Sequence, residues 1–178
     1  MFEGIFAGFG GQGVMLMGQL VAYSGMYEGK NVSWVPSYGP EMRGGTANCS
    51  VVVSEEEVGS PVFTEPNVLV TMNRPSLEKF EASLQPGGLL FYNSSLIHIK
   101  PQRTDITAIA IPANDLATEL GNSKVANMVV LGAVIKKTGV INVETAMRVL
   151  TEKVLTGKKE KLIPINRAAL NRGMELAG

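Results

Sequence analysis

The sequence predicts an α/β fold, in which a mostly parallel sheet carries helices on both faces and the C-terminal third is helical. Three observations favour it. Strand-like and helix-like segments alternate through the first two thirds of the chain, as in βαβ units. A length of 178 residues and an apolar content of 45% suit one hydrophobic core. No internal repeat, low-complexity tract or linker interrupts residues 1–178, so we expect a single domain.

The first part of the chain contains three predicted strands and one helix. Gly4–Ala7 is a short apolar run that reads as a buried strand. Val14–Glu28 places apolar residues at helical spacing, and Gly29 stands where a C-terminal cap belongs. Asn31–Pro36 is the second strand, which the proline ends. Thr46–Ser54 alternates in part and is the third strand, a candidate for antiparallel pairing.

The middle of the chain continues the alternation of strands and helices. Asn67–Met72 is a strand, and a helix follows over Pro75–Leu84, where proline suits the first turn. The turn at Pro86–Gly88 leads into a buried strand over Leu89–Tyr92. Asp105–Ile111 is the last clear strand.

Four helices are predicted to complete the chain, over Pro112–Leu120, Val125–Thr138, Val143–Leu155 and Pro164–Leu176. The second is strongly apolar. Asn122 or Ser123 can cap its start, and Gly139 closes it. The third is amphipathic, as expected of a helix with one solvent-facing side.

The balance of charges argues against some partners. Lys and Arg together number 16, as do Asp and Glu, so the net charge is about zero. Since a nucleic-acid binder normally carries a basic excess, we expect no nucleic-acid partner. A protein with so little net charge is poorly protected against association with other molecules, which favours a subunit of a larger assembly.

The cysteine and histidine content limits the metal chemistry. Cys49 is the only cysteine and His98 the only histidine. One thiol forms no internal disulfide and supplies only one of the about four thiolates that an iron–sulfur cluster needs. We expect Cys49 to be buried and inert, and we expect no metal site.

No membrane or export signal is apparent. No basic residue precedes Lys30, glycines break the apolar N-terminal stretch, and no apolar run reaches the length of a membrane span. We therefore expect a cytoplasmic protein without a membrane partner.

A glycine-rich turn separates the first strand from the first helix. Gly8, Gly10 and Gly13 match the spacing G-x-G-x-x-G of a Rossmann-like fold, in which the backbone approaches a phosphate at a helix N-terminus. Binding of NAD also calls for an acidic residue about 20 positions on, but Val32–Pro36 contains none. Two interpretations stay open: contact with a phosphate, or close packing of strand and helix.

The predicted topology brings several loops together. Loops that leave the carboxyl ends of parallel strands gather at one edge of the sheet, and ligands bind there. Those loops are Gly8–Gly13, Pro36–Gly45, Asn73–Pro75, Asn93–Ser95 and Pro112–Asn114.

The second of these loops carries a distinctive sequence, Tyr38-Gly39-Pro40-Glu41-Met42-Arg43-Gly44-Gly45-Thr46-Ala47-Asn48. With Gly8-Phe9-Gly10-Gly11-Gln12-Gly13 it resembles the gamma subunit of 2-oxoacid:ferredoxin oxidoreductases, which act on pyruvate, 2-oxoglutarate, 2-ketoisovalerate or indolepyruvate. The resemblance covers nearly the whole chain. It includes Asn73-Arg74-Pro75, Pro86-Gly87-Gly88, Asn93-Ser94-Ser95, and Asn127 with Leu131-Gly132-Ala133.

The resemblance implies a subunit that is not active alone. The complex would convert a 2-oxoacid and coenzyme A to acyl-CoA and CO₂, with ferredoxin as the electron acceptor. Thiamine diphosphate, Mg and iron–sulfur clusters would lie in alpha, beta and ferredoxin-like delta subunits, because this sequence has no thiamine-binding segment and one cysteine. Whether the isolated chain forms a homodimer stays open.

The resemblance also implies which residues form the coenzyme A side of the composite site. The candidates that would contact coenzyme A are Gly8, Gly10, Gly11, Gln12, Gly13, Arg43, Gly44, Asn73, Asn93 and Ser95. Arg43 could pair with a phosphate or with a partner carboxylate, and we expect no catalytic and no metal-binding residue. Asn127 could serve as a buried hydrogen-bonding residue or reach the ligand edge. Two other functions remain: a stand-alone oxidoreductase that uses NAD or a flavin, and a purely structural subunit.

Overall fold

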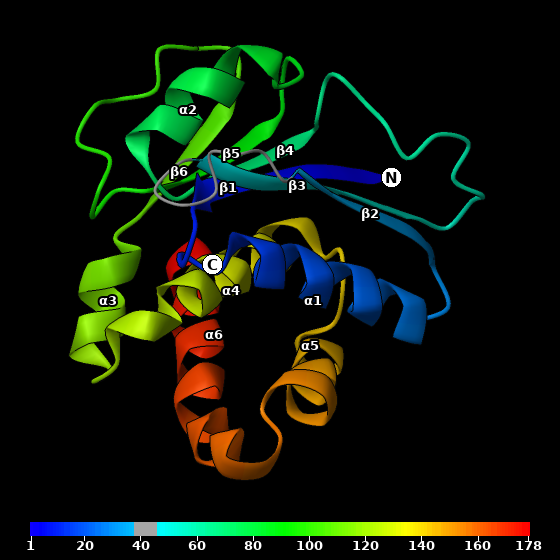
Figure 1. The fold of residues 1–178 in the computed structure, drawn as a ribbon. Coiled ribbons are helices and arrows are strands. Elements are labelled where there is room, and N and C mark those ends of the chain that lie inside the picture. Colours follow the sequence, from blue (N-terminus) through cyan, green and yellow to red (C-terminus); the bar gives the residue numbers. More distant parts are fainter. Residues whose placement is uncertain (38–45) are drawn as a thin grey trace.

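The structure is a computed structural model that describes residues 1–37 and 46–178 (Figure 1). Within these residues the chain forms one six-stranded sheet in the order β2-β3-β1-β4-β5-β6. The strands are β1 (Phe2–Phe9), β2 (Asn31–Ser37), β3 (Thr46–Ser54), β4 (Val68–Thr71), β5 (Leu89–Asn93) and β6 (Thr107–Ile111). Strands β1, β4, β5 and β6 pair in parallel, so the prediction of an α/β fold with a mostly parallel sheet is confirmed.

Strand β3 is the antiparallel exception that the sequence suggested. It pairs antiparallel with β1 on one side and with β2 on the other. Only residues 38–45 separate β2 from β3, whereas a parallel return needs a crossover of about a dozen residues or more. The short connection therefore makes β3 antiparallel to β2. Strand β3 also lies next to β1, in the place that the second strand takes in a doubly wound sheet.

The helices follow the predicted order. They are α1 (Val14–Tyr27), α2 (Arg74–Phe80), α3 (Ala113–Glu119), α4 (Ala126–Thr138), α5 (Val143–Val149) and α6 (Ile163–Ala177). Asn122 caps the 3₁₀ turn Ser123–Val125 before α4, because its Oδ1 accepts from Lys124 N at 2.9 Å. The helix predicted over Val143–Leu155 is α-helical only to Val149. A π-helical turn, Leu150–Val154, then widens the coil, and Leu155 N donates to Leu150 O at 2.8 Å.

Helices cover both faces of the sheet (Figure 1). On one face Phe6, Val70 and Phe91 join the large core that contains the buried sides of α1 and α4. On the other, Ile5, Leu69 and Leu90 pack with Leu77 of α2. The alternation follows from the strand period of two, and parallel strands covered on both sides are apolar in both directions. No helix within the described residues has the length and apolar character needed to cross a membrane.

The helical C-terminal third is held by the close crossing of α4 and α6. A Cβ added at Gly132 would overlap the carbonyl oxygen of Leu170, and one at Gly173 would overlap that of Val129. The two backbones therefore touch, which only residues without a side chain allow. Because α4 also lines the core under the sheet, this crossing attaches α6 to the α/β body.

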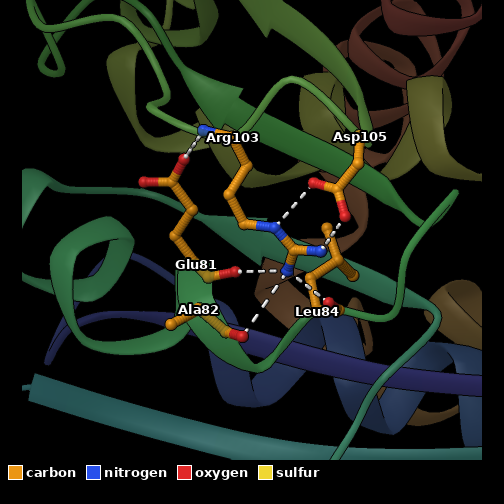
Figure 2. Close-up of polar contacts among 5 residues, drawn as sticks. All are labelled: Glu81, Ala82, Leu84, Arg103 and Asp105. Atoms are coloured by element: carbon orange, nitrogen blue, oxygen red, sulfur yellow. Dashed lines mark hydrogen bonds and ion pairs between the residues drawn. The ribbon is translucent and has the colours of Figure 1, made fainter.

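An arginine-centred cluster fixes the long connection between β5 and β6 (Figure 2). Arg103 donates from Nε and Nη2 to the two carboxylate oxygens of Asp105, at 2.8 and 2.6 Å. Its Nη1 donates to the carbonyls of Glu81 and Leu84 at the end of the α2 region. The Glu81 carboxylate in turn accepts from the backbone N–H groups of Gln102 and Arg103. These bonds tie the connection to the α2 segment. The hydrogen bond from Arg103 also lowers the pKa of the Asp105 carboxyl group.

We expect Arg103→Ala to loosen residues 94–106, because the guanidinium joins the Asp105 carboxylate to the carbonyls of Glu81 and Leu84. Limited proteolysis with mass spectrometry should show new cleavage there. Arg103→Lys should also be cleaved, since an ammonium keeps the charge but not the planar fork. Arg74→Ala is the control, because the Arg74–Glu78 pair is exposed and should contribute little. Equal cleavage in Arg103→Ala and Arg74→Ala would contradict this role.

Candidate functional site

The glycine-rich turn lies at the carboxyl edge of the parallel strands, as predicted. It follows β1, and Gly13 is the N-cap of α1 with a left-handed backbone at φ 75°. A Cβ at Gly8 would lie 2.7 Å from Oε1 of Gln12 and 2.9 Å from Cβ of Met72, and a Cβ at Gly13 would overlap the Asn127 side chain. Gly11, at φ 90°, has no atom within 4 Å of its Cβ position. Gly8 and Gly13 thus serve packing, while Gly11 faces open space.

Gln12 connects the turn to the neighbouring strand. Its Oε1 accepts from Phe9 N at 2.6 Å and from Nδ2 of Asn73 at 3.2 Å. Its Nε2 donates to the carbonyl of Met72 at 3.2 Å. All of these contacts keep the turn closed against the end of β4.

Asn73 and Asn93 are both buried at the ends of β4 and β5. Asn73 caps α2, with Oδ1 accepting from Ser76 N at 2.9 Å. Asn93 donates from Nδ2 to Met72 O at 3.3 Å and to Oδ1 of Asn114 at 2.7 Å. Its Oδ1 accepts from Ala113 N at 3.2 Å, at the start of α3.

Ser95 extends the same series of contacts to α3. Its hydroxyl donates to Oδ2 of Asp115 at 3.0 Å and accepts from Asp115 N at 3.1 Å. The structure therefore brings Gln12, Asn73, Asn93 and Ser95 to one edge, as predicted, but their polar atoms bond to one another and to the backbone. Gly10 lies in the turn itself. Arg43 and Gly44 lie outside the described residues.

A small hollow of about 100 Å³ opens beside the turn. Its lining residues are Gly11, Gln12, Met72, Asn114, Ser123, Lys124, Ala126 and Asn127. This volume suits a phosphate-sized group rather than a whole nucleotide, since drug-sized ligands occupy about 300 Å³ or more. Lys124 is exposed and contributes the positive charge of the lining.

Three residues that line the hollow were not predicted as site residues. Ser123 and Lys124 precede α4, and Asn114 lies in α3, at the end of a loop that was expected at the ligand edge. The sequence could have indicated Lys124 as a site residue, because it lies in a capped turn after the last strand, at the edge where the loops meet. Asn127 does both things considered for it: Nδ2 donates to Gly13 O at 3.4 Å, and the side chain lines the hollow.

A larger hollow, of about 450 Å³, lies at the opposite, amino-terminal end of β1. Lys30 is among its lining residues, but the ammonium is engaged by Val140 O at 2.8 Å and by Glu28 at 3.2 Å. Its walls come from residues that the topology does not bring to the ligand edge. We therefore place the candidate site at the glycine-rich turn.

Cys49 is buried in β3 beneath α1, and its thiol contacts Val14 O at 3.6 Å. Burial raises the pKa of the thiol to about 12, so it stays protonated at neutral pH. Within residues 1–37 and 46–178 no three His, Cys, Asp or Glu side chains form a group that could hold a metal ion. The described residues do offer a polar hollow of phosphate size beside the turn.

Comparison with known proteins identifies the family. The family model for pyruvate ferredoxin/flavodoxin oxidoreductase matches residues 3–176. The chain belongs to that family. The resemblance inferred from the two loops is thus confirmed, and solved gamma subunits of the family share the fold.

Curated members of the family include both short and long relatives. VorA, a ketoisovalerate oxidoreductase subunit from Methanothermobacter marburgensis, is 40% identical over 172 residues, which are 96% of this chain and 35% of VorA. KorC, a 2-oxoglutarate synthase subunit from Methanocaldococcus jannaschii, is 32% identical, with 96% of this chain and 91% of KorC covered. The chain thus spans about a third of VorA and nearly all of KorC.

Two solved structures of the family agree closely with this fold. The gamma subunit of a keto/oxoacid ferredoxin oxidoreductase from Geobacter sulfurreducens has a TM-score of 0.84 and 32% identity, covering 99% of this chain and 98% of that one. The 2-oxoglutarate:ferredoxin oxidoreductase from Magnetococcus marinus has a TM-score of 0.90 and 26% identity, covering 99% of this chain and 31% of that one.

The two positive-φ glycines of the turn allow a matched test of packing in this family member. Alanine at either position should lower the free energy of unfolding by about 1–2 kcal/mol, because the residue must adopt a left-handed backbone. Gly13→Ala should lower the free energy of unfolding more than Gly11→Ala does, because the added methyl group at position 13 would overlap Asn127. Urea unfolding measures both losses. Asn127→Ala added to Gly13→Ala should recover part of the difference, and equal losses for the two glycine variants would disprove the close contact.

We expect the Cys49 thiol to resist alkylation in the folded chain and to react fully in denaturant. The raised pKa also sets a pH dependence. Between its ordinary value of 9.0 and about 12, the thiol ionises in the unfolded chain but not in the folded one, so stability falls as pH rises. Cys49→Ala should remove the part of the alkaline loss of stability that comes from this thiol. Rapid alkylation at pH 8 without denaturant would contradict the burial.

Proposed function

We propose that this chain is the gamma-type subunit of a multi-subunit 2-oxoacid:ferredoxin oxidoreductase. The complex oxidatively decarboxylates a 2-oxoacid to acyl-CoA and CO₂, acting on an oxo group with an iron–sulfur protein as acceptor. The observation that carries the proposal is the end-to-end match with a gamma subunit, which covers 99% of this chain and 98% of the Geobacter protein.

Alpha, beta and ferredoxin-like delta subunits supply the redox chemistry in this proposal. They hold thiamine diphosphate, Mg and the iron–sulfur clusters, and ferredoxin takes the electrons. The sequence in hand has one cysteine, which is buried with a raised pKa and cannot supply the about four thiolates of a cluster. The gamma-type chain contributes packing and has no activity by itself.

Its second contribution is the coenzyme A edge of the composite site. The turn ends at the N-terminus of α1, where backbone N–H groups and the helix dipole favour an anion. Gly11 is open to the surface, and Lys124 brings a positive charge to the adjoining hollow. A phosphate of coenzyme A fits that chemistry and that volume. The Magnetococcus structure to which this chain is similar contains 2-oxoglutarate, coenzyme A and succinyl-CoA.

A purely structural subunit is the second candidate, and a specific observation favours it. The polar atoms of Gln12, Asn73, Asn93 and Ser95 are engaged in internal hydrogen bonds. Their convergence can therefore serve rigidity alone. A stand-alone NAD enzyme is less well supported, because β3 separates β2 from β1 and moves the end of β2 one strand further from the turn.

We expect Lys124→Ala, and separately Arg43→Ala, to raise the KM of the assembled complex for coenzyme A about tenfold. Loss of one charge-assisted contact to a phosphate is worth about 1.5–3 kcal/mol. The kcat at saturating coenzyme A should change little, because neither residue takes part in decarboxylation. Steady-state kinetics of the purified complex measure both quantities. Lys158→Ala, in the exposed turn Gly157–Leu162, is the control.

Three outcomes separate the candidate functions. An unchanged KM in both variants, with normal assembly, would leave the structural subunit as the better description. Loss of assembly would move Arg43 or Lys124 to a subunit interface. Purification of the chain from its native cell as a lone, active redox enzyme, or tight NAD or FAD binding by it, would overturn the main proposal.

A further inference from the structure

Helix α1 has an unusual composition for a helix at a surface. Its fourteen residues, Val14–Tyr27, include no Asp, Glu, Lys or Arg. A surface helix normally presents charged residues on its outward side, whereas a helix that is apolar all round is buried. The buried side of α1 packs on β3 and β2. Its outward side also lacks charged residues, which is typical of a surface that another polypeptide covers.

Large apolar side chains gather on that outward side. Tyr23, Met26 and Tyr27 are 42%, 56% and 39% exposed. Two hollows flank the helix: one of about 340 Å³ toward β2, and one of about 210 Å³ toward the end of the α5 region. Tyr23 lines both. Contiguous exposed apolar surface of this kind marks interaction sites.

Strand β2 forms the other border of the surface. It is an edge strand, since β3 is its only partner in the sheet of the described residues. Val32 and Trp34 of this strand line the larger hollow. An exposed edge next to an apolar helix is a surface that folded proteins usually cover. We call Tyr23, Met26, Tyr27 and Trp34 the α1–β2 face.

The charges around the face are not balanced. Nζ of Lys153 lies 5.1 Å from the centre of the Tyr23 ring, and the guanidinium of Arg148 lies 5.1 Å from that of Tyr27. Arg148 is paired with Glu152 at 3.0 Å. Lys153 forms no ion pair with another residue of the described chain. One positive charge at the border is therefore left for a carboxylate from outside.

We propose that the α1–β2 face docks a partner polypeptide of the oxidoreductase, one that presents apolar side chains and a carboxylate opposite Lys153. This inference rests on the proposed function. The lengths of the relatives support a polypeptide neighbour, because the matched segment is 35% of VorA and 31% of the Magnetococcus chain. In both proteins the domain is joined to about twice as much additional chain.

A second copy of this chain fits the face less well. A two-fold interface pairs each patch with itself, so it would place two Lys153 ammonium groups at the border. The acid available there, Glu152, is already engaged by Arg148. A different polypeptide with its own carboxylate can cover the apolar surface and also pair with the Lys153 ammonium group.

The test uses tagged chain purified from its native cell with its complex. Met26→Glu places a charge in the middle of the face, and Lys153→Glu reverses the charge at its border. Leu176→Glu is the matched control, because Leu176 of α6 is 42% exposed, like Tyr23, but lies outside the face. The readout is the amount of thiamine diphosphate and of its binding subunit recovered per chain, with thermal unfolding to verify that each variant folds.

We expect Met26→Glu and Lys153→Glu to lower that recovery at least about tenfold, as a loss of 1.4 kcal/mol or more would. Leu176→Glu should recover as much partner as the wild type. Normal recovery with both face variants would overturn the docking surface while leaving the proposed function intact. No recovery with the wild type would overturn the proposed function itself. If the isolated chain is a dimer that Met26→Glu converts to a monomer, a second copy covers the face and the proposed partner is wrong.

Discussion

The carbonyl oxygen of Met72, just past the end of β4, accepts hydrogen bonds from two side-chain amides. Gln12 donates from the turn after β1, and Asn93 donates from the end of β5. The strands β1, β4 and β5 are neighbours, so this one acceptor links the ends of three consecutive strands. Asn73, next in sequence, adds the α2 cap to the same group. The starts of α1, α2 and α3 are all fixed by contacts that radiate from this point.

The antiparallel strand β3 determines what such an edge can bind. By lying between β1 and β2, it removes the neighbouring strand whose end would hold the ribose of a dinucleotide. What remains at the turn is a helix N-terminus, an open Gly11 and the lysine before α4. That set has the size and charge of a phosphate site, which is what the proposed coenzyme A edge requires.

Local patterns predicted most of the fold, and contacts distant in sequence account for what they missed. Buried strands such as Leu89–Asn93 and the apolar helix α4 are visible in hydrophobic periodicity alone. The meeting of Gln12, Asn73 and Asn93 follows from strand order. That these amides satisfy one another depends on side-chain orientation across some 60 residues, which no spacing rule supplies. The Arg103 cluster and the place of Lys124 beside the turn are of the same kind.

Helix α1 connects the proposed ligand edge with the proposed docking surface. Its N-terminus belongs to the ligand edge, and Met26 lies near its other end. At 1.5 Å per residue, Gly13 and Met26 are about 20 Å apart along the helix axis. A partner seated over Tyr23 and Met26 therefore need not touch the hollow beside the turn, although it would contact the same helix. Since Gln12 and Asn127 tie the turn to the end of β4 and to α4, a partner docked on α1 would meet a turn that is already formed.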